Sequence, residues 1–167
     1  MIDNRNYTFF WKTESPFSNF YKCEFIVDNV LFFSSEQYFS YKKAMAFMDA
    51  DTAELILKTK LPWEAKKLGR QVKNFKKEEW DNMCERIMYD AVYNKFNQNK
   101  VLLNFLINTN DTKFVESSPV DSLWGIGLSE EDARKTPEEQ WPGKNLFGII
   151  LTQLREDLKK QQNNKNK

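Results

Sequence analysis

The chain has 167 residues, and its 25 Lys and Arg residues nearly balance its 24 Asp and Glu residues, which gives a formal net charge of +1. This balance excludes a protein that is held to nucleic acid by bulk charge alone, because such domains carry a clear basic excess. Aromatic residues make up 15% of the sequence, which is enough for a hydrophobic core and excludes general disorder.

The composition also limits the kinds of active site. The sequence contains no histidine, and its two cysteines, Cys23 and Cys84, lack the spacing of metal ligands. We therefore expect no metal site, no cofactor and no Ser-His-Asp or Cys-His catalytic group. No apolar run reaches the roughly 20 residues that span a bilayer, and the first residues show no signal-peptide pattern. These features favour a protein of the reducing cytoplasm that does not associate with membranes.

The first part of the chain predicts short strands and a turn. Residues 7–11 form a predicted strand, and residues 15–20, which are rich in Pro, Ser and Asn, form a predicted loop. The apolar segments 25–27 and 30–33 enclose Asp28-Asn29, which is a turn signal. This pattern is typical of a β-hairpin.

The middle of the chain changes to helical spacing. Ser34 followed by Gln37 is typical of a capping box, so we expect a helix from Ser34 to about residue 47. The apolar spacing predicts further helices over residues 51–59, 63–71, 77–97 and 100–108.

The last part of the chain predicts a strand over residues 113–116, an irregular stretch over 117–128 and an amphipathic helix over about 144–160. The polar residues 161–167 predict a disordered tail. Together these elements predict one domain over residues 1–160, of the α+β class and mainly helical, with a small N-terminal β-sheet.

Two charged residues of the first predicted helix share one face. Glu36 and Lys43 are seven positions apart, nearly two turns, which separates them by about 10.5 Å along the axis at 1.5 Å per residue. A carboxylate and an amine at this separation could hold one sugar ring between them, and the first turn of a helix favours anions. The alternative is a helix face whose charged side chains point into solvent.

The segment Asp121–Gly127 is a second candidate. Glycines such as Gly125 allow a backbone to approach a ligand closely, and the indole of Trp124 can stack on a base or a sugar. Asp121 could accept a hydrogen bond from a ribose hydroxyl or hold a water molecule. The alternative is a loop that Trp124 pins in the core, with Asp121 capping a turn.

Three weaker signals remain. Lys67 and Arg70 are neighbours on a predicted helix and could bind a phosphate, although basic pairs of this kind are usually exposed. The segment Gly143–Asn145 could bind an anion at the start of the last helix or simply be its entry turn. A polar pair stands beside a ring in the early loop, at Ser18, Asn19 and Phe20.

Taken in order, these motifs resemble the NADAR family, also called YbiA-like, over about residues 7–158. The resemblance rests on the segments Ser15–Phe20, Ser35–Phe39 with Lys43, Leu68–Arg70, Asp121–Gly127 and Gly143–Gly148. Each motif is weak by itself, whereas five in the same order are specific. Gln37 departs from the pattern, because the family often has His at this position; an amide can keep a hydrogen bond but cannot titrate.

The resemblance implies a compact, mainly helical YbiA-like fold and an N-glycosidase, which hydrolyses the bond between a ribose C1 and a nitrogen. Members of the family split phosphoribosylamino-pyrimidine intermediates of riboflavin synthesis, or remove ADP-ribose from guanine bases in nucleic acid. The resemblance also implies catalytic roles for Glu36, Lys43 and Asp121. With the signals above, the substrate-binding candidates are Ser18, Asn19, Phe20, Lys67, Arg70, Trp124 and Gly125.

The mechanism that follows as a hypothesis uses a Schiff base. A neutral Lys43 amine attacks the opened sugar at C1, and Glu36 moves protons as general acid and base. Asp121 orients the ribose hydroxyls or the water, and Trp124 walls the pocket. The alternative is a non-catalytic module that binds ADP-ribose or another NAD-derived ligand, which would not need Glu36 together with Lys43.

Overall fold

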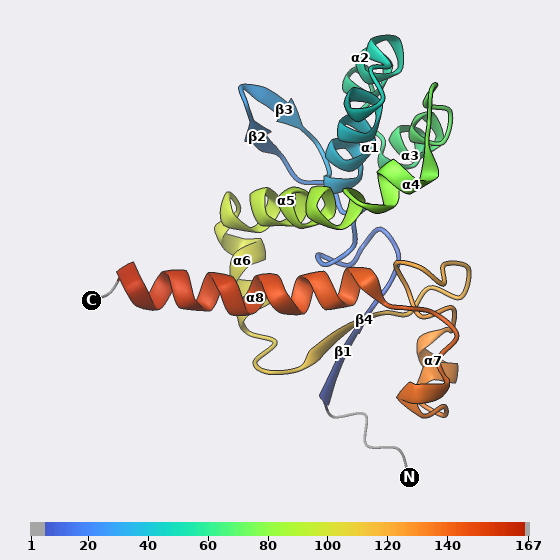
Figure 1. Cartoon of the computed structure of the whole chain (residues 1–167). Helices are drawn as coiled ribbons and strands as arrows, with labels where there is room; N and C mark the ends of the chain where they lie inside the picture. The colour runs from blue at the N-terminus through green and yellow to red at the C-terminus, as the bar shows by residue number, and fades with distance from the viewer. Residues whose placement is uncertain (1–5, 166–167) are drawn as a thin grey trace. The chain divides into compact units, whose positions relative to one another are not determined.

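The computed structural model describes residues 6–165, and the chain divides into two compact units. The first unit contains the residues up to Ser18 together with those from Leu103 onward, and the second contains Asn19–Leu102. Figure 1 shows helices and strands in both units. These elements confirm the α+β, mainly helical class, whereas one domain over residues 1–160 stays a prediction.

In the first unit, a two-stranded parallel sheet packs against the last helix. β1 (Tyr7–Phe10) pairs with β4 (Lys113–Glu116), and α8 (Leu146–Lys165) packs on β4. Two short elements, α7 (Glu130–Ala133) and η2 (Glu138–Gln140), lie between β4 and α8 in the sequence. Both strands were predicted but their pairing was not, because the spacing within a strand does not identify its partner.

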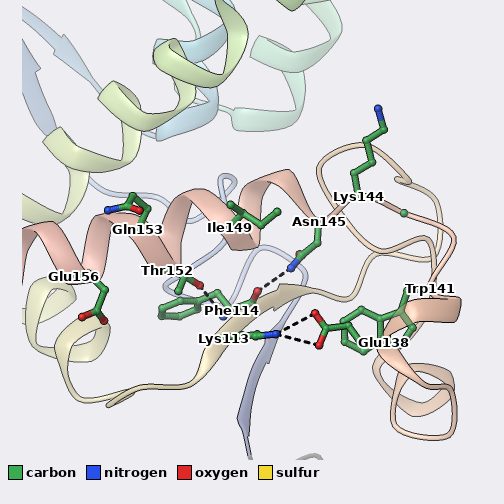
Figure 2. Close-up of a pocket in the computed structure, with 11 residues that line it drawn as sticks. Lys113, Phe114, Glu138, Trp141, Lys144, Asn145, Ile149, Thr152, Gln153 and Glu156 are labelled. Carbon is green, nitrogen blue, oxygen red and sulfur yellow. Dashed lines mark hydrogen bonds and ion pairs between the residues drawn. The ribbon is translucent and has the colours of Figure 1, made fainter.

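Side chains near the start of α8 bind the edge of β4 that β1 leaves free. The side chain of Asn145 accepts a hydrogen bond from the Glu116 N–H at 3.0 Å and donates one to the Phe114 carbonyl at 2.9 Å. Thr152 accepts a hydrogen bond from the Phe114 N–H at 3.1 Å (Figure 2). These bonds satisfy backbone groups that an edge strand would otherwise expose.

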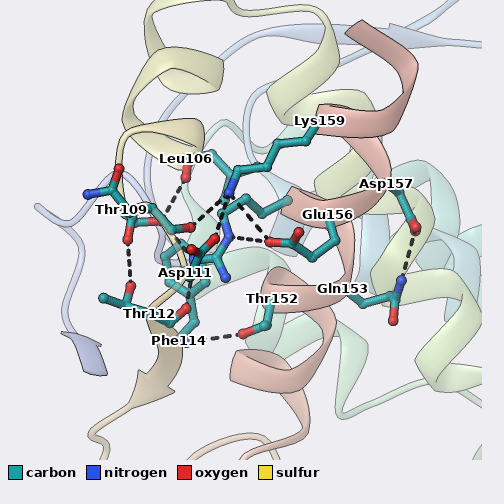
Figure 3. A network of polar contacts seen from close by, with 12 residues as sticks. Leu106, Thr109, Asp111, Thr112, Phe114, Thr152, Gln153, Glu156, Asp157 and Lys159 are labelled. Carbon is teal, nitrogen blue, oxygen red and sulfur yellow. Dashed lines mark hydrogen bonds and ion pairs between the residues drawn. The ribbon is translucent and has the colours of Figure 1, made fainter. Parts of the chain in front are cut away.

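A buried arginine fixes the second half of the same helix. Arg155 is only 1% exposed, and its Nη1 donates to the Thr109 hydroxyl at 3.0 Å and to the Thr112 carbonyl at 2.6 Å. Lys159, one turn later, donates to the Asn110 carbonyl at 3.0 Å and to Asp111 Oδ1 at 3.2 Å (Figure 3). The helix is therefore fastened to the turn that precedes β4.

In the second unit, the predicted hairpin forms from β2 (Phe25–Val27) and β3 (Val30–Phe32). The turn residues Asp28 and Asn29 both have positive φ angles, of 50° and 63°. Two such residues in succession are typical of the type I′ turn, whose twist matches that of the strands.

The helices of the second unit pack around α1 (Ser35–Ala46), which contacts α2, α3 and α5. All but one of the predicted helices of this part of the chain lie within two residues of an observed one. The observed helices that follow α1 are α2 (Ala50–Lys58), α3 (Pro62–Gly69), α4 (Lys77–Asp81), α5 (Cys84–Asn97) and α6 (Lys100–Ile107). The boundary between the two units falls within α6.

The predicted helix over residues 77–97 is wrong, because the chain forms two helices there. Asn82 ends α4, and Met83 leaves the helical region with a φ angle of −122°. Asp81 and Asn82 both compete with helical hydrogen bonding and favour helix ends. Apolar spacing continues in both helices, so the pattern alone did not reveal the break.

The end of the last helix also differs from the prediction. α8 continues to Lys165, so residues 161–165 are helical rather than part of a disordered tail over 161–167. Gln161 and Gln162 are good helix formers, and they continue a helix that buried residues such as Leu158 already anchor. Residues 166 and 167 lie outside the described part of the chain.

Over residues 6–165, no helix combines the length and the apolar character that crossing a membrane would require.

The core of the second unit contains a lysine. Lys95 on α5 is fully buried, with its Nζ 5.0 Å from the centre of the Phe96 ring and 5.5 Å from that of Tyr21. Burial lowers the pKa of Lys95 to about 8, and the nearby Cys23 opposes this change. Unfolding restores the ordinary pKa, so stability is linked to pH.

We predict that the stability of the wild type increases as the pH rises through the titration of Lys95, and that Lys95→Met lacks this increase. Between pH 8 and 10.5 the unfolded chain keeps a proton that the folded Lys95 has released, so the free energy of unfolding rises with pH in this window. From pH 7.5 to 9 the wild type should gain about 1 kcal/mol relative to the variant, measured by urea unfolding. The exposed Lys100→Met is the control, and equal pH dependence in all three proteins would contradict the prediction.

Candidate functional site

The N-terminal turn of α1 is fastened to the loop that precedes it in sequence. The hydroxyl of Ser34 caps the helix by accepting a hydrogen bond from the Gln37 N–H at 3.1 Å. The Glu36 N–H donates to the Asn19 carbonyl at 3.1 Å, and the Ser35 hydroxyl donates to the same oxygen at 3.3 Å. The predicted candidates Asn19 and Glu36 are therefore in direct contact.

The carboxylate of Glu36 is buried and receives two side-chain hydrogen bonds. Glu36 is 7% exposed; Asn19 Nδ2 donates to its Oε2 at 2.9 Å, and the Ser40 hydroxyl donates to its Oε1 at 3.1 Å. Burial raises the pKa of Glu36, while Lys66, Asn19, Ser40 and Arg70 act to lower it. A carboxyl group in this environment can hold a proton and release it, as a general acid must.

Lys43 lies two turns further along α1, against aromatic rings. Its Nζ is 4.4 Å from the centre of the Phe75 ring and 5.5 Å from that of Trp80. Desolvation lowers the pKa of Lys43, the Glu36 charge raises it and the Arg70 charge lowers it. Lys43 therefore loses its proton more readily than a lysine side chain in water. This half-buried lysine is not the freely solvated side chain of the alternative interpretation.

The face of α3 beside Glu36 supplies positive charge. Lys66 and Arg70 both act on the pKa of Glu36, and Lys66 is the larger influence of the two. The Lys66 Nζ lies 5.4 Å from the centre of the Phe20 ring. Sequence reasoning chose the neighbouring Lys67 instead, which is exposed. We call Glu36, Lys43, Lys66 and Arg70 the α1–α3 charge cluster.

Lys66 was missed because two adjacent lysines look alike in a sequence. The available signal was the apolar stripe of α3, in which Pro62, Ala65 and Gly69 are buried. Lys66 and Arg70 lie on the same side of the helix beside this stripe, because residues four apart lie above one another. Lys67 is one position further along, so its side chain is rotated about 100° away from that of Lys66.

Gln37 has a structural role at the start of α1. Its Oε1 accepts a hydrogen bond from the Phe33 N–H at 2.8 Å. Its Nε2 donates to the carbonyls of Ile56 and Thr59, at 3.0 and 2.7 Å. The amide thus binds the start of α1 to the end of α2. In the predicted capping box, Ser34 caps as expected, while Gln37 turns to these partners.

The loop with Asp121 and Trp124 belongs to the first unit. Asp121 Oδ1 accepts hydrogen bonds from the N–H groups of Leu123 at 3.0 Å and Trp124 at 2.9 Å. Asp121 therefore caps a turn, as in the alternative interpretation of this segment from the sequence. Trp124 is half-buried. Gly125 is needed for packing, since a Cβ there would lie 2.9 Å from the carbonyl oxygens of both Asp121 and Glu116.

The same loop binds the entry to α8. The N–H groups of Gly143, Lys144 and Asn145 donate to carbonyls of the loop, at 2.8 to 3.0 Å, and those of Leu146 and Phe147 continue the series at 3.2 and 3.0 Å. These donors are used within the fold, so the segment Gly143–Asn145 is an entry turn rather than an anion site.

The remaining predicted residues are placed as follows. Ser18 is buried in the first unit, and its N–H donates to the Ser15 carbonyl at 3.0 Å. In the second unit, Asn19 donates a hydrogen bond to Glu36, and the charges of Lys43, Arg70 and Glu36 influence one another. Phe20 contacts Lys66. Roles for Ser18, Asp121, Trp124 and Gly125 in catalysis or substrate binding stay predictions.

A pocket of about 410 Å³ lies within the first unit (Figure 2). Its rim carries Trp141 and an ion pair between Lys113 and Glu138 at 3.2 Å. Two of its polar side chains, Asn145 and Thr152, already bind the backbone of β4. Among residues 6–165, no group of three or more His, Cys, Asp and Glu side chains could hold a metal ion.

Comparison with known proteins places these features in a family. The NADAR domain model matches residues 9–159. Protein irg-1 of Caenorhabditis elegans is 39% identical over 168 residues, which cover 91% of this chain and 79% of that protein. N-glycosidase R617 of Acanthamoeba polyphaga mimivirus is 40% identical over 124 residues, with 74% and 73% of the two chains covered.

A solved structure agrees with the fold. The NMR structure of the Escherichia coli protein YbiA matches with a TM-score of 0.78 and 28% sequence identity, and the match covers 96% of this chain and 89% of that one. By sequence, N-glycosidase YbiA of Escherichia coli K12 is 32% identical over 142 residues, which are 85% of this chain and 80% of that protein.

We predict that Ser40→Ala raises the pKa of Glu36 further. The variant removes a hydrogen bond that stabilises the ionised carboxylate and leaves the burial in place. Carboxyl NMR titration of protein labelled with ¹³C-glutamate measures the shift. The control is Ser122→Ala, an exposed serine of the first unit, which should leave the Glu36 titration unchanged. A Glu36 pKa that stays the same or falls in Ser40→Ala would contradict the assignment.

Proposed function

Since the chain belongs to the NADAR family, we propose that it is an N-glycosidase that hydrolyses a ribose C1–N bond. The observation that carries the proposal is the pairing, on one face of α1, of a buried carboxyl group with a raised pKa and an amine with a lowered pKa. Relatives named N-glycosidase support this reaction class. The hydrolysis requires no oxidant or reductant.

The substrate is a ribosyl compound with a phosphate group. The name of one relative, a riboflavin biosynthesis protein of Vibrio vulnificus, supports phosphoribosylamino-pyrimidine intermediates as one class. ADP-ribosylated guanine in DNA or RNA is the other, because a single modified base needs only a pocket and a few phosphate contacts. We place the reaction in the cytoplasm.

The first half of the proposed reaction transfers the sugar to the enzyme. Protonated Glu36 gives its proton to the ring oxygen, the C1–O bond breaks, and the nitrogen lone pair forms an iminium at C1. The neutral amine of Lys43 adds to C1. The substrate nitrogen then leaves with a proton from Lys43, and a protonated Schiff base remains between Lys43 and C1.

The second half regenerates the enzyme. Water adds to C1 and gives a proton to the Glu36 carboxylate, and the C1–N bond to Lys43 then breaks, which releases the amine and an open-chain sugar aldehyde that recloses. Phe75 and Trp80 limit solvent around the amine. As the family resemblance implies, Asp121 would orient the ribose hydroxyls and Trp124 would stack on the substrate.

Asn19 has a second proposed task besides holding Glu36. Its Oδ1 is buried and has no hydrogen-bond partner within residues 6–165. An acceptor left in this way costs about 1–3 kcal/mol. A ribose hydroxyl that donates to this oxygen would recover that cost, which supports a substrate-binding role.

We predict product release from one of two substrates. The purified protein is offered ADP-ribosylated guanine in DNA and, separately, the phosphoribosylamino-pyrimidine intermediates, and free ADP-ribose or ribose 5-phosphate is measured. In Glu36→Gln, turnover should fall by about 100-fold or more while substrate binding stays within a few-fold, as expected for a lost general acid. Tight binding by the wild type without release from any substrate would instead establish a non-catalytic binding module.

We predict a covalent adduct on Lys43. Borohydride added during turnover reduces the Schiff base to a stable secondary amine, and peptide mass spectrometry locates the added sugar. Lys43→Met should abolish the adduct. The control is Lys42→Met, at the adjacent position, where the Nζ lies 5.9 Å from the centre of the Tyr38 ring. Turnover without a trapped adduct, or an adduct on another lysine, would refute the Schiff-base step.

A further inference from the structure

We propose that Lys66 and Arg70 form a phosphoryl-binding subsite beside Glu36 and that Lys67 takes no part in it. The inference deepens the proposed function and rests on it, since it assigns the phosphate of the ribosyl substrate to a particular face of α3. The shared chemistry is a phosphoryl group on the ribose O5, either as a monoester or as the diphosphate of ADP-ribose.

The packing of α3 on α1 aims this face at the carboxylate. A Cβ at Gly69 would lie 2.7 Å from the Ser40 hydroxyl oxygen, and that hydroxyl donates to Glu36. Only a glycine leaves room for so close an approach. Lys66 and Arg70, three positions before and one position after Gly69, therefore border the turn of α1 that carries Glu36.

The early loop contacts the Lys66 ammonium group, whose charge acts on Glu36. The Phe20 ring lies below the Lys66 Nζ, 5.4 Å away, and the preceding residue, Asn19, donates to the Glu36 carboxylate. The contact between an ammonium group and a ring restricts the lysine without using its hydrogen-bond donors. Those donors remain suited to phosphate oxygens, and Arg70 adds a guanidinium fork.

The charge of the cluster fits a phosphoryl group. With Glu36 ionised, the α1–α3 charge cluster carries two more positive charges than negative ones, provided that Lys43 is protonated. A phosphate monoester carries about −1.5 to −2 at pH 7. Such a ligand would neutralise the excess, whereas an uncharged sugar would leave it in place.

Binding of small molecules tests the subsite without turnover. Calorimetry measures ribose 5-phosphate, ADP-ribose and unphosphorylated ribose against the wild type, Lys66→Met, Arg70→Met and Lys67→Met. Methionine keeps the aliphatic stem, and circular dichroism confirms that each variant is folded. Lys66→Met and Arg70→Met should weaken the phosphorylated ligands roughly tenfold or more, as expected for a charge-assisted hydrogen bond, while Lys67→Met should stay within about twofold of the wild type.

Each outcome decides the inference. Equal effects of Lys66→Met and Lys67→Met, or binding of ribose as tight as that of ribose 5-phosphate, would overturn it. Loss of ribose 5-phosphate binding in Lys66→Met identifies a monoester subsite, and loss of ADP-ribose binding alone identifies a diphosphate subsite. Binding that depends on Lys66 in a protein that cleaves no N-glycoside would refute the proposed function and leave the subsite intact.

Discussion

The site depends on one costly feature, the burial of the Glu36 carboxylate between α1 and α3. Removing a carboxylate from water is unfavourable unless hydrogen bonds and opposite charges replace the lost hydration. Asn19 and Ser40 supply the hydrogen bonds, and Lys66 and Arg70 supply the charge. Because these compensations are incomplete, the pKa of Glu36 remains above its ordinary value, which is the property that an acid catalyst needs.

The neighbouring residue shows how the fold supports that feature. Gln37 binds the end of α2 and the residue before the helix cap, so it fixes the end of α1 on which Glu36 stands. A His at this position could make only two such bonds through its ring nitrogens, whereas the amide makes three. The departure from the family pattern therefore changes a structural contact at the start of α1.

Much of the fold could be predicted from local patterns. The type I′ turn at Asp28-Asn29 and the cap at Ser34 depend on adjacent residues, so the sequence contains their full signal. The pairing of β1 with β4 and the choice between Lys66 and Lys67 depend on contacts between distant segments. The break at Met83 was hidden because apolar residues continue at helical spacing on both sides of it.

In the proposed site, the position of Lys66 would also link binding of the substrate's phosphoryl group to the protonation state of Glu36. Lys66 is the strongest of the influences that lower the pKa of Glu36. A phosphoryl group bound to Lys66 would neutralise that charge and bring its own negative charge toward the carboxyl group, and both effects raise the pKa of Glu36. Binding of the phosphorylated end of the substrate would then favour protonated Glu36, the form that the proposed first step uses. A cationic contact that lies outside the reacting bond would in this way contribute to the chemistry of the bond.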